Sequence, residues 1–113
     1  MPEAKFMTIN ITPNSSAEHL RRDLEEQARN HGLNLRTLVA KIYAYAASNK
    51  DQFDGPLSPA RKKPGEHIGA SVPEGVGRAL TAWAKERSTP RGYHCCFILE
   101  KALVSKDLQA MLK

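Results

Sequence analysis

Two short stretches of the chain alternate apolar side chains with mostly polar ones. Residues 6–11 set Met7, Ile9 and Ile11 against Phe6, Thr8 and Asn10. Residues 67–72 set Ile68, Ala70 and Val72 against His67, Gly69 and Ser71. The alternation has a period of two, which predicts β-strands with one apolar face and one exposed face. Thr, Asn, His and Ser on the exposed face are short hydrogen-bond donors and acceptors, which suit recognition of a partner.

Catalytic chemistry is not indicated elsewhere in the sequence. There is no Gly-rich phosphate loop, no paired-carboxylate constellation and no nucleophile–base set. The histidines are scattered through separate predicted elements, and each is expected at the surface or at a boundary: His19, His31, His67 and His94. We therefore expect that the protein is not an enzyme and that it uses no cofactor.

The cysteines, Cys95 and Cys96, are neighbours and directly follow His94. This cluster lacks a second, separated pair of ligands, so no metal site is expected. Adjacent cysteines do not form a useful disulfide, and a secreted domain of this size usually carries more of them. We expect Cys95 to be a small core residue and Cys96 to be half-buried.

Length and charge limit the possible partners. The chain has 113 residues, which suits one compact domain or two very small units. Its net charge of +5 permits nucleic acid or an acidic membrane as a partner, and the purely basic run Arg61-Lys62-Lys63 makes the excess local. No apolar run approaches the roughly 20 residues that cross a bilayer, and the first residues lack a signal-peptide layout. A cytoplasmic location without membrane contact is therefore expected.

Each strand pattern is followed by two helical patterns. In the first half, a serine in TPNSS caps a helix that ends at Gly32, and Asn34 caps the next helix. In the second half, Pro73-Glu74 opens a helix, and Thr89 caps another with Pro90 at its first position. The apolar stripes of the four helices consist of Leu20, Leu24 and Ala28; Val39, Ile42, Tyr43 and Ala46; Val76, Leu80 and Ala84; and Cys95, Ile98, Leu99 and Ala102.

The two halves superpose as an internal repeat. A shift of 56 residues places the helical stripes of the first half on those of the second without a gap, whereas the strands need a shift of 61. We expect a first copy over 1–50, a Pro/Gly-rich basic linker over 51–65 and a second copy over 66–113. One copy is too small to bury a core alone, so the two strands should pair antiparallel over four helices.

An exposed two-stranded ribbon suits one particular partner. Such a ribbon fits the major groove of double-stranded DNA, where outward side chains meet the edges of the bases. Any single outward residue is more simply explained as an ordinary solvent-facing position, but the whole set on a basic protein favours DNA. The cations Arg61, Lys62 and Lys63 are expected to contact phosphates.

Four features resemble the ribbon–helix–helix repressors, which have the Met-repressor-like or Arc-like fold. They are the order strand–helix–helix, the apolar spacing, the turn A-R-N-H-G and the strand ending I-x-A-x-V-P. The resemblance implies a mainly α fold with a two-stranded antiparallel ribbon. Most members of the family are homodimers of one short copy. Two copies in one chain therefore resemble a built-in dimer, a tandem pseudo-dimer like that of some plasmid conjugation accessory proteins.

The resemblance also implies roles for individual residues. The base-reading positions of the family correspond here to Phe6, Thr8, Asn10, His67, Gly69 and Ser71. Phe6 would contact a thymine methyl group or swing inward. The family binds phosphates at the start of the second helix, and the corresponding residues are Asn34, Leu35 and Arg36 in the first copy and Arg91 and Gly92, after Pro90, in the second.

The process served by DNA binding stays open at this point. A transcriptional repressor and a conjugation accessory protein would have the same sequence features, and single chains could line up on tandem sites. The alternative is an antitoxin-like or other protein-interaction module, which would offer Leu108, Met111 and Leu112 to a partner. Packing of these C-terminal residues on their own domain is the simpler expectation.

Overall fold

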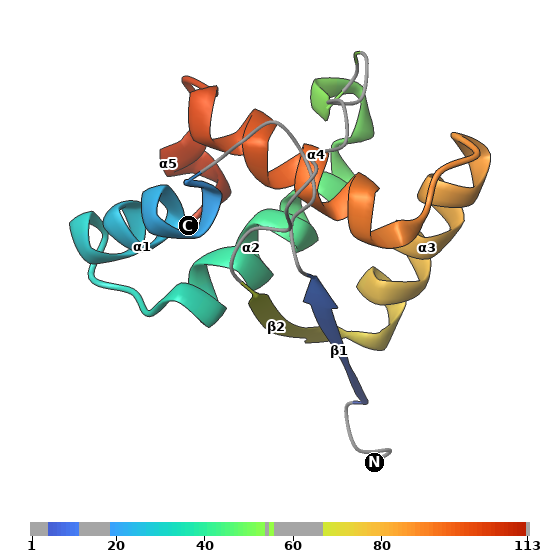
Figure 1. Cartoon of the computed structure of the whole chain (residues 1–113), viewed down its shortest axis with the longest axis horizontal. Helices are drawn as coiled ribbons and strands as arrows, with labels where there is room; N and C mark the ends of the chain where they lie inside the picture. The colour runs from blue at the N-terminus through green and yellow to red at the C-terminus, as the bar shows by residue number, and fades with distance from the viewer. Residues whose placement is uncertain (1–4, 12–18, 54, 56–66, 113) are drawn as a thin grey trace.

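The computed structural model describes residues 5–11, 19–53, 55 and 67–112. The elements follow the order β1 (Phe6–Ile11), α1 (Leu20–Asn30), α2 (Leu35–Ser48), the 3₁₀ helix η1 (Lys50–Phe53), β2 (Ile68–Pro73), α3 (Glu74–Glu86), α4 (Arg91–Val104) and α5 (Leu108–Met111). In Figure 1 the two strands lie at one side of the molecule and the helices at the other. The predicted mainly helical fold with one small sheet is confirmed.

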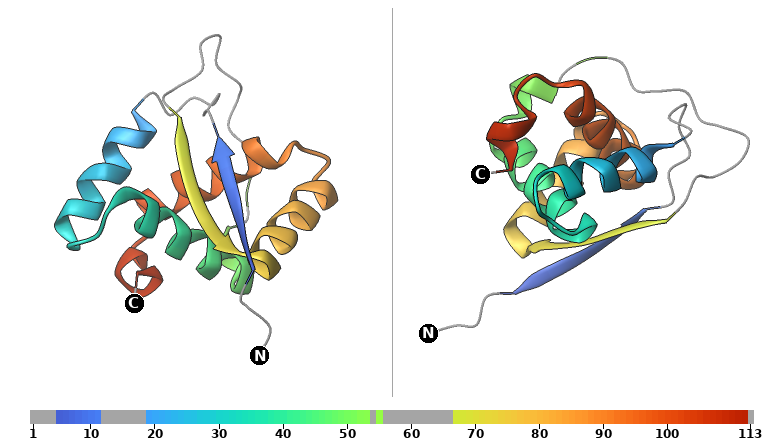
Figure 2. Two further views of the ribbon diagram at one scale, coloured as in Figure 1. Left: turned by 90° about the horizontal axis from the view of Figure 1, so that it is seen from below. Right: turned by 90° about the vertical axis from the view of Figure 1, so that its left-hand side faces the viewer.

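Strands β1 and β2 form a two-stranded antiparallel sheet, as predicted. Ile9 pairs with Ala70, and the register continues to Phe6 opposite Pro73 and Ile11 opposite Ile68. Figure 2 shows the helices on one side of this ribbon, so that its other side faces solvent. The apolar alternation explains the orientation, because it places the buried side chains Ile9, Ile11, Ile68, Ala70 and Val72 on the helix side.

The turn between α1 and α2 has the predicted signals. Gly32 adopts φ +68°, and the amide of Leu33 donates to the carbonyl of Ala28 at 2.8 Å. These are the features of a Schellman C-cap, in which glycine avoids the steric cost of a left-handed residue. Asn34 caps α2, since its side-chain oxygen accepts from the amide of Thr37 at 2.8 Å. The serine cap predicted for α1 lies outside the described residues.

The turn between α3 and α4 repeats this geometry with different residues. Ser88 takes the left-handed position at φ +54°, and the amide of Thr89 donates to the carbonyl of Ala84 at 3.0 Å. Helix α4 begins one residue later than predicted, because Pro90 stands at its N-cap and Arg91 is its first residue. The φ angle to which proline is restricted suits the N-cap position, as it also suits the first helical position.

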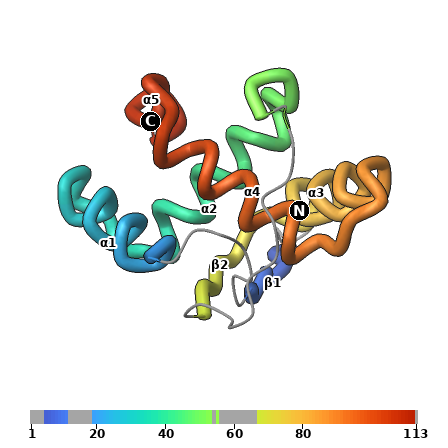
Figure 3. Tube along the Cα trace, turned by 45° about the horizontal axis from the view of Figure 1, so that its top comes forward, coloured from blue at the N-terminus to red at the C-terminus, as the bar shows by residue number. Residues whose placement is uncertain are grey.

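The core lies between the ribbon and the helices. Figure 3 shows α2 and α4 in the centre, with α1 at one end and α3 at the other. Cys95 is a buried core residue as expected, but Cys96, expected to be half-buried, is 1% exposed. The expectation for His94 was also wrong, because it lies fully buried rather than at a boundary. Helix α4 is central and has apolar neighbours on several sides. More of its residues are therefore buried than the single apolar stripe predicted from the sequence.

The beginning of the expected linker is part of this core. Residues 50–53 form η1, and Phe53 is 1% exposed. Its ring contacts Tyr45 and Trp83 edge-to-face, with ring centroids 6.3 Å and 6.4 Å away. Proline and glycine in the segment indicated a linker, but they all follow Phe53. The chain therefore stays packed for one more turn after α2.

The C-terminal residues fold back on the same domain. Helix α4 ends at Val104, and the short α5 places Leu108 and Met111 in the core at 8% and 4% exposure. Leu112 is partly buried against them. This packing is what the simpler expectation for the C-terminus predicted. Within the part of the chain that the structure describes, no helix combines the length and apolarity needed to span a bilayer.

Candidate functional site

The solvent-facing side of the ribbon is the candidate site. Thr8, Asn10 and Ser71 are exposed there, and Phe6 is 65% exposed rather than swung inward. At the centre, the hydroxyls of Thr8 and Ser71 approach each other at 3.5 Å across the two strands. This face combines hydrogen-bonding groups with one large apolar ring and carries no side chain needed by the core.

Gly69 leaves a space on this face that other side chains use. A Cβ atom at Gly69 would lie 2.7 Å from Oδ1 of Asn10, which stands opposite in the register. It would also lie 3.3 Å from Cε1 of His67 and 3.9 Å from Nη2 of Arg36. The missing side chain therefore lets the Asn10 amide from β1 lie over β2, close to the Arg36 guanidinium from α2.

A groove runs beside the ribbon along α2, from Arg36 to Ala44. It has a volume of about 450 Å³ and is lined by Phe6, Arg36, Thr37, Ala40, Lys41, Ala44, Ser71 and Pro73. Ala40 and Ala44 contribute small apolar side chains to its lining, and Arg36 and Lys41 supply positive charge. Sequence reasoning did not identify Thr37, Lys41 or the alanines as site residues. Their four-residue spacing, Thr37–Lys41 and Ala40–Ala44, is the signal that they share one helix face.

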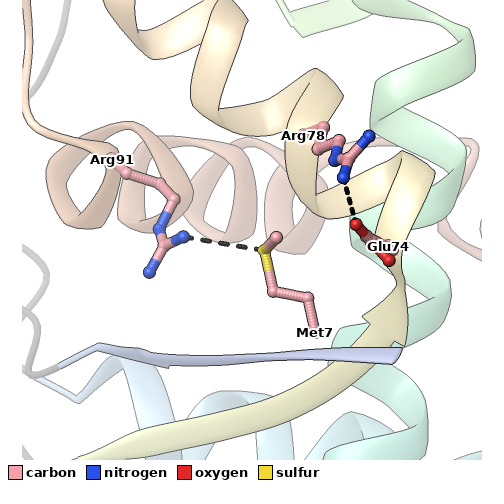
Figure 4. Close-up of polar contacts among 4 residues, drawn as sticks. All are labelled: Met7, Glu74, Arg78 and Arg91. Carbon is pink, nitrogen blue, oxygen red and sulfur yellow. Dashed lines mark hydrogen bonds and ion pairs between the residues drawn. The ribbon is translucent and has the colours of Figure 1, made fainter. Parts of the chain in front are cut away.

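The start of α4 is arranged differently from the start of α2. Figure 4 shows the guanidinium of Arg91 directed at Met7, and its Nη1 lies 3.8 Å from the Met7 sulfur. Met7 itself packs against Gly77 of α3 on the helix side of the ribbon. Figure 4 also shows Arg78 in an ion pair with Glu74 in the first turn of α3. Arg91 is therefore directed toward the inner side of the ribbon.

The predicted phosphate-contacting residues are only partly brought together. Asn34, Leu35 and Arg36 lie at the start of α2 beside β2, whereas Arg91 and Gly92 lie at the start of α4 near β1. The side chain of Asn34 caps α2 by accepting a hydrogen bond from the amide of Thr37. The other amides of the first helical turn have no acceptor within the helix. Arg61, Lys62 and Lys63 lie outside the described residues.

An aromatic cluster between α3 and α4 was not identified from the sequence. His94 packs between Trp83 and Phe97, with ring centroids 4.2 Å and 5.9 Å away, and neither ring nitrogen has a partner among the described residues. Burial, together with the charges of Arg87 and Lys50, lowers the pKa of His94 to about 4. His94 is therefore neutral at physiological pH, and it belongs to the core rather than to the exposed face.

The buried Cys95 thiol is not a reactive group. Burial raises the pKa of the Cys95 thiol to about 12, which keeps it protonated and unreactive. Within the described ranges, no three His, Cys, Asp or Glu side chains are placed to hold a metal ion. Comparisons of the chain with family models, with curated proteins and with solved structures found no match.

Proposed function

We propose that the protein binds double-stranded DNA by inserting its β-ribbon into the major groove. The observation that carries this proposal is the exposed ribbon face, on which Thr8, Asn10 and Ser71 point away from the core. A two-stranded ribbon has the width that the major groove admits, and short polar side chains can reach the edges of the bases. The cations Arg36 and Lys41 border the ribbon and favour a polyanion as the partner.

We also propose that the two strand–helix–helix units are tandem copies that form a pseudo-dimer. Two differences in residue number between equivalent positions of the two units support this proposal. The carbonyl–amide pairs Ala28–Leu33 and Ala84–Thr89 close equivalent helix turns and differ by 56 positions. Ile9 and Ala70 pair with each other in the ribbon and differ by 61 positions, the offset that superposes the strands. A residue that pairs with its own equivalent lies on a two-fold axis, as in a symmetric dimer.

The cellular role that we propose is transcriptional repression or accessory DNA binding in plasmid conjugation. The antitoxin-like alternative needs an exposed protein-binding surface near the C-terminus. Leu108 and Met111 are buried within their own domain, so these two side chains do not favour that alternative. DNA recognition by the ribbon is the property shared by both remaining roles.

Selection of bound duplexes from a random pool, at two salt concentrations, tests the proposed function. We expect a preferred site that is an imperfect palindrome, with an affinity that falls steeply as salt increases. Lys106→Ala is a matched control for loss of one positive charge, because Lys106 lies between α4 and α5, away from the ribbon. Failure of the wild-type chain to retain any duplex above background would exclude the proposal.

Asn10 should contribute more to site preference than Ser71. Asparagine can bond bidentately to adenine, whereas serine makes a single, permissive bond. We expect Asn10→Ala to cost about 1–3 kcal/mol of binding free energy on the best site and little on scrambled DNA. Ser71→Ala should cost less, and both variants should stay folded because both side chains are exposed. Titrations of the two variants against both duplexes check this; equal losses on both duplexes would show that Asn10 does not read bases.

The basic run Arg61-Lys62-Lys63 should strengthen binding without adding specificity. Replacing all three residues by alanine should weaken binding to every duplex alike. It should also flatten the salt dependence by up to roughly 0.9 log units per lost phosphate contact. Affinities of the triple variant at several salt concentrations, on the best and the scrambled site, measure both effects. A changed preference between sites would contradict the prediction, as would an unchanged affinity.

A further inference from the structure

We propose that Arg36 reads a base pair next to the one read by Asn10, and that this happens at only one end of the ribbon. This inference rests on the proposed DNA binding and concerns the specificity of the same face. The observation behind it is the space at Gly69, where Oδ1 of Asn10 and Nη2 of Arg36 lie 2.7 Å and 3.9 Å from the position that a Cβ atom would take.

The direction of the Arg36 side chain distinguishes it from a phosphate-binding residue. Phosphates flank the major groove, whereas the outward face of an inserted ribbon lies over the base edges. Arg36 belongs to the first turn of α2, yet its guanidinium reaches over β2 at Gly69, beside the exposed side chain of Asn10. A side chain at position 69 would displace the Asn10 amide, because its Cβ atom would lie 2.7 Å from Oδ1, whereas its contact with Nη2 of Arg36 at 3.9 Å would be an ordinary one.

The second copy has no equivalent of this arrangement. The second residue of α2 is Arg36, and the second residue of α4 is Gly92. The neighbouring Arg91 directs its guanidinium at Met7, on the inner side of the ribbon. The paired guanidinium and amide therefore occur once, and the two half-sites should differ.

The chemistry of the two groups predicts the bases. Arginine bonds bidentately to O6 and N7 of guanine, and asparagine bonds bidentately to N6 and N7 of adenine. One half of the preferred site should therefore contain a G·C pair next to an A·T pair. The other half, which faces Ser71 and lacks an arginine, should show no matching G·C requirement.

Four versions of the full chain test the inference: wild type, Arg36→Ala, Arg36→Lys and the control Lys106→Ala. Each is used in duplex selection and then titrated against the best site, a site with the G·C pair replaced by A·T, and scrambled DNA. We expect Arg36→Ala to weaken binding to the best site by roughly 5- to 150-fold, the range for loss of one bidentate base contact. Its affinity for the site with A·T in place of G·C, and for scrambled DNA, should stay within about 3-fold of the wild-type affinity. The site that it selects should lose one G·C pair.

Arg36→Lys separates charge from geometry, because lysine keeps the positive charge and loses the planar fork. We expect this variant to show a weaker G·C preference than wild type and a stronger one than Arg36→Ala, because an ammonium also donates to O6 and N7 of guanine, while its salt dependence stays unchanged. Gly69→Ala is an independent variant, since a methyl group there displaces the Asn10 amide without touching the core. It should weaken binding to the best site and leave binding to scrambled DNA unchanged.

The outcomes separate this inference from the proposed function. Arg36→Ala could instead lose affinity equally on all three duplexes, with the slope of log affinity against log salt concentration reduced in magnitude by about 0.9. That result would show that Arg36 contacts a phosphate. Such a result overturns the inference and leaves DNA binding by the ribbon intact. Unchanged binding by Arg36→Ala also overturns it. Failure of the wild-type chain to bind any duplex overturns the proposed function and the inference together.

Discussion

Phe53→Ala should lower the free energy of unfolding by about 3–5 kcal/mol, the cost of removing a fully buried aromatic side chain. Phe53 is 1% exposed and contacts the rings of Tyr45 and Trp83, so its loss opens a cavity between α2 and α3. These elements also support the ribbon, which cannot be stable as an isolated hairpin. Urea denaturation of the variant and the wild type measures the effect.

The neighbouring Gln52 provides a matched control for this result. Gln52 is exposed, and its side-chain oxygen accepts a hydrogen bond from the Tyr45 hydroxyl at 2.8 Å. Gln52→Ala should cost less than about 1 kcal/mol, because an exposed hydrogen bond exchanges readily with water. A similar cost for the two variants would show that residues 50–53 are connecting chain rather than core.

Acidification should destabilise the protein through His94. In the folded protein the pKa of His94 is lowered to about 4, whereas the ordinary value is 6.5. Between these two pH values the unfolded chain binds a proton that the folded protein does not, so stability is lost as the pH falls from about 6.5 to about 4. Each pKa unit corresponds to about 1.4 kcal/mol, so the loss is on the order of 3 kcal/mol and is complete below about pH 4.

His94→Leu isolates this contribution, because leucine has a similar volume and no titratable group. The difference in unfolding free energy between wild type and variant should change with pH only between about 4 and 6.5. Carboxyl groups titrate equally in both proteins and cancel in the difference. Denaturation at a series of pH values provides the measurement. A difference that stays constant with pH would show that His94 is accessible to protons in the folded state.

Local rules account for the parts of the fold that the sequence alone determined. The alternation over residues 6–11 and 67–72 specified two strands and their buried faces, since successive strand residues point to opposite sides. Gly32 and Asn34 specified the turn between α1 and α2, because each has a conformational or capping role that depends only on near neighbours. The same alternation predicted the exposed face of the candidate site.

Only the tertiary structure decided which distant side chains meet. The strand and helix patterns in the sequence did not predict that Phe53 and His94 are core residues. They are buried because η1, α3 and α4 pack around them. The approach of Arg36 to Gly69 joins residues of α2 and β2, and its geometry depends on how the helix docks beside the ribbon. Hydrophobic periodicity records which face of an element is buried, whereas the partner across that face is determined by packing of the whole chain.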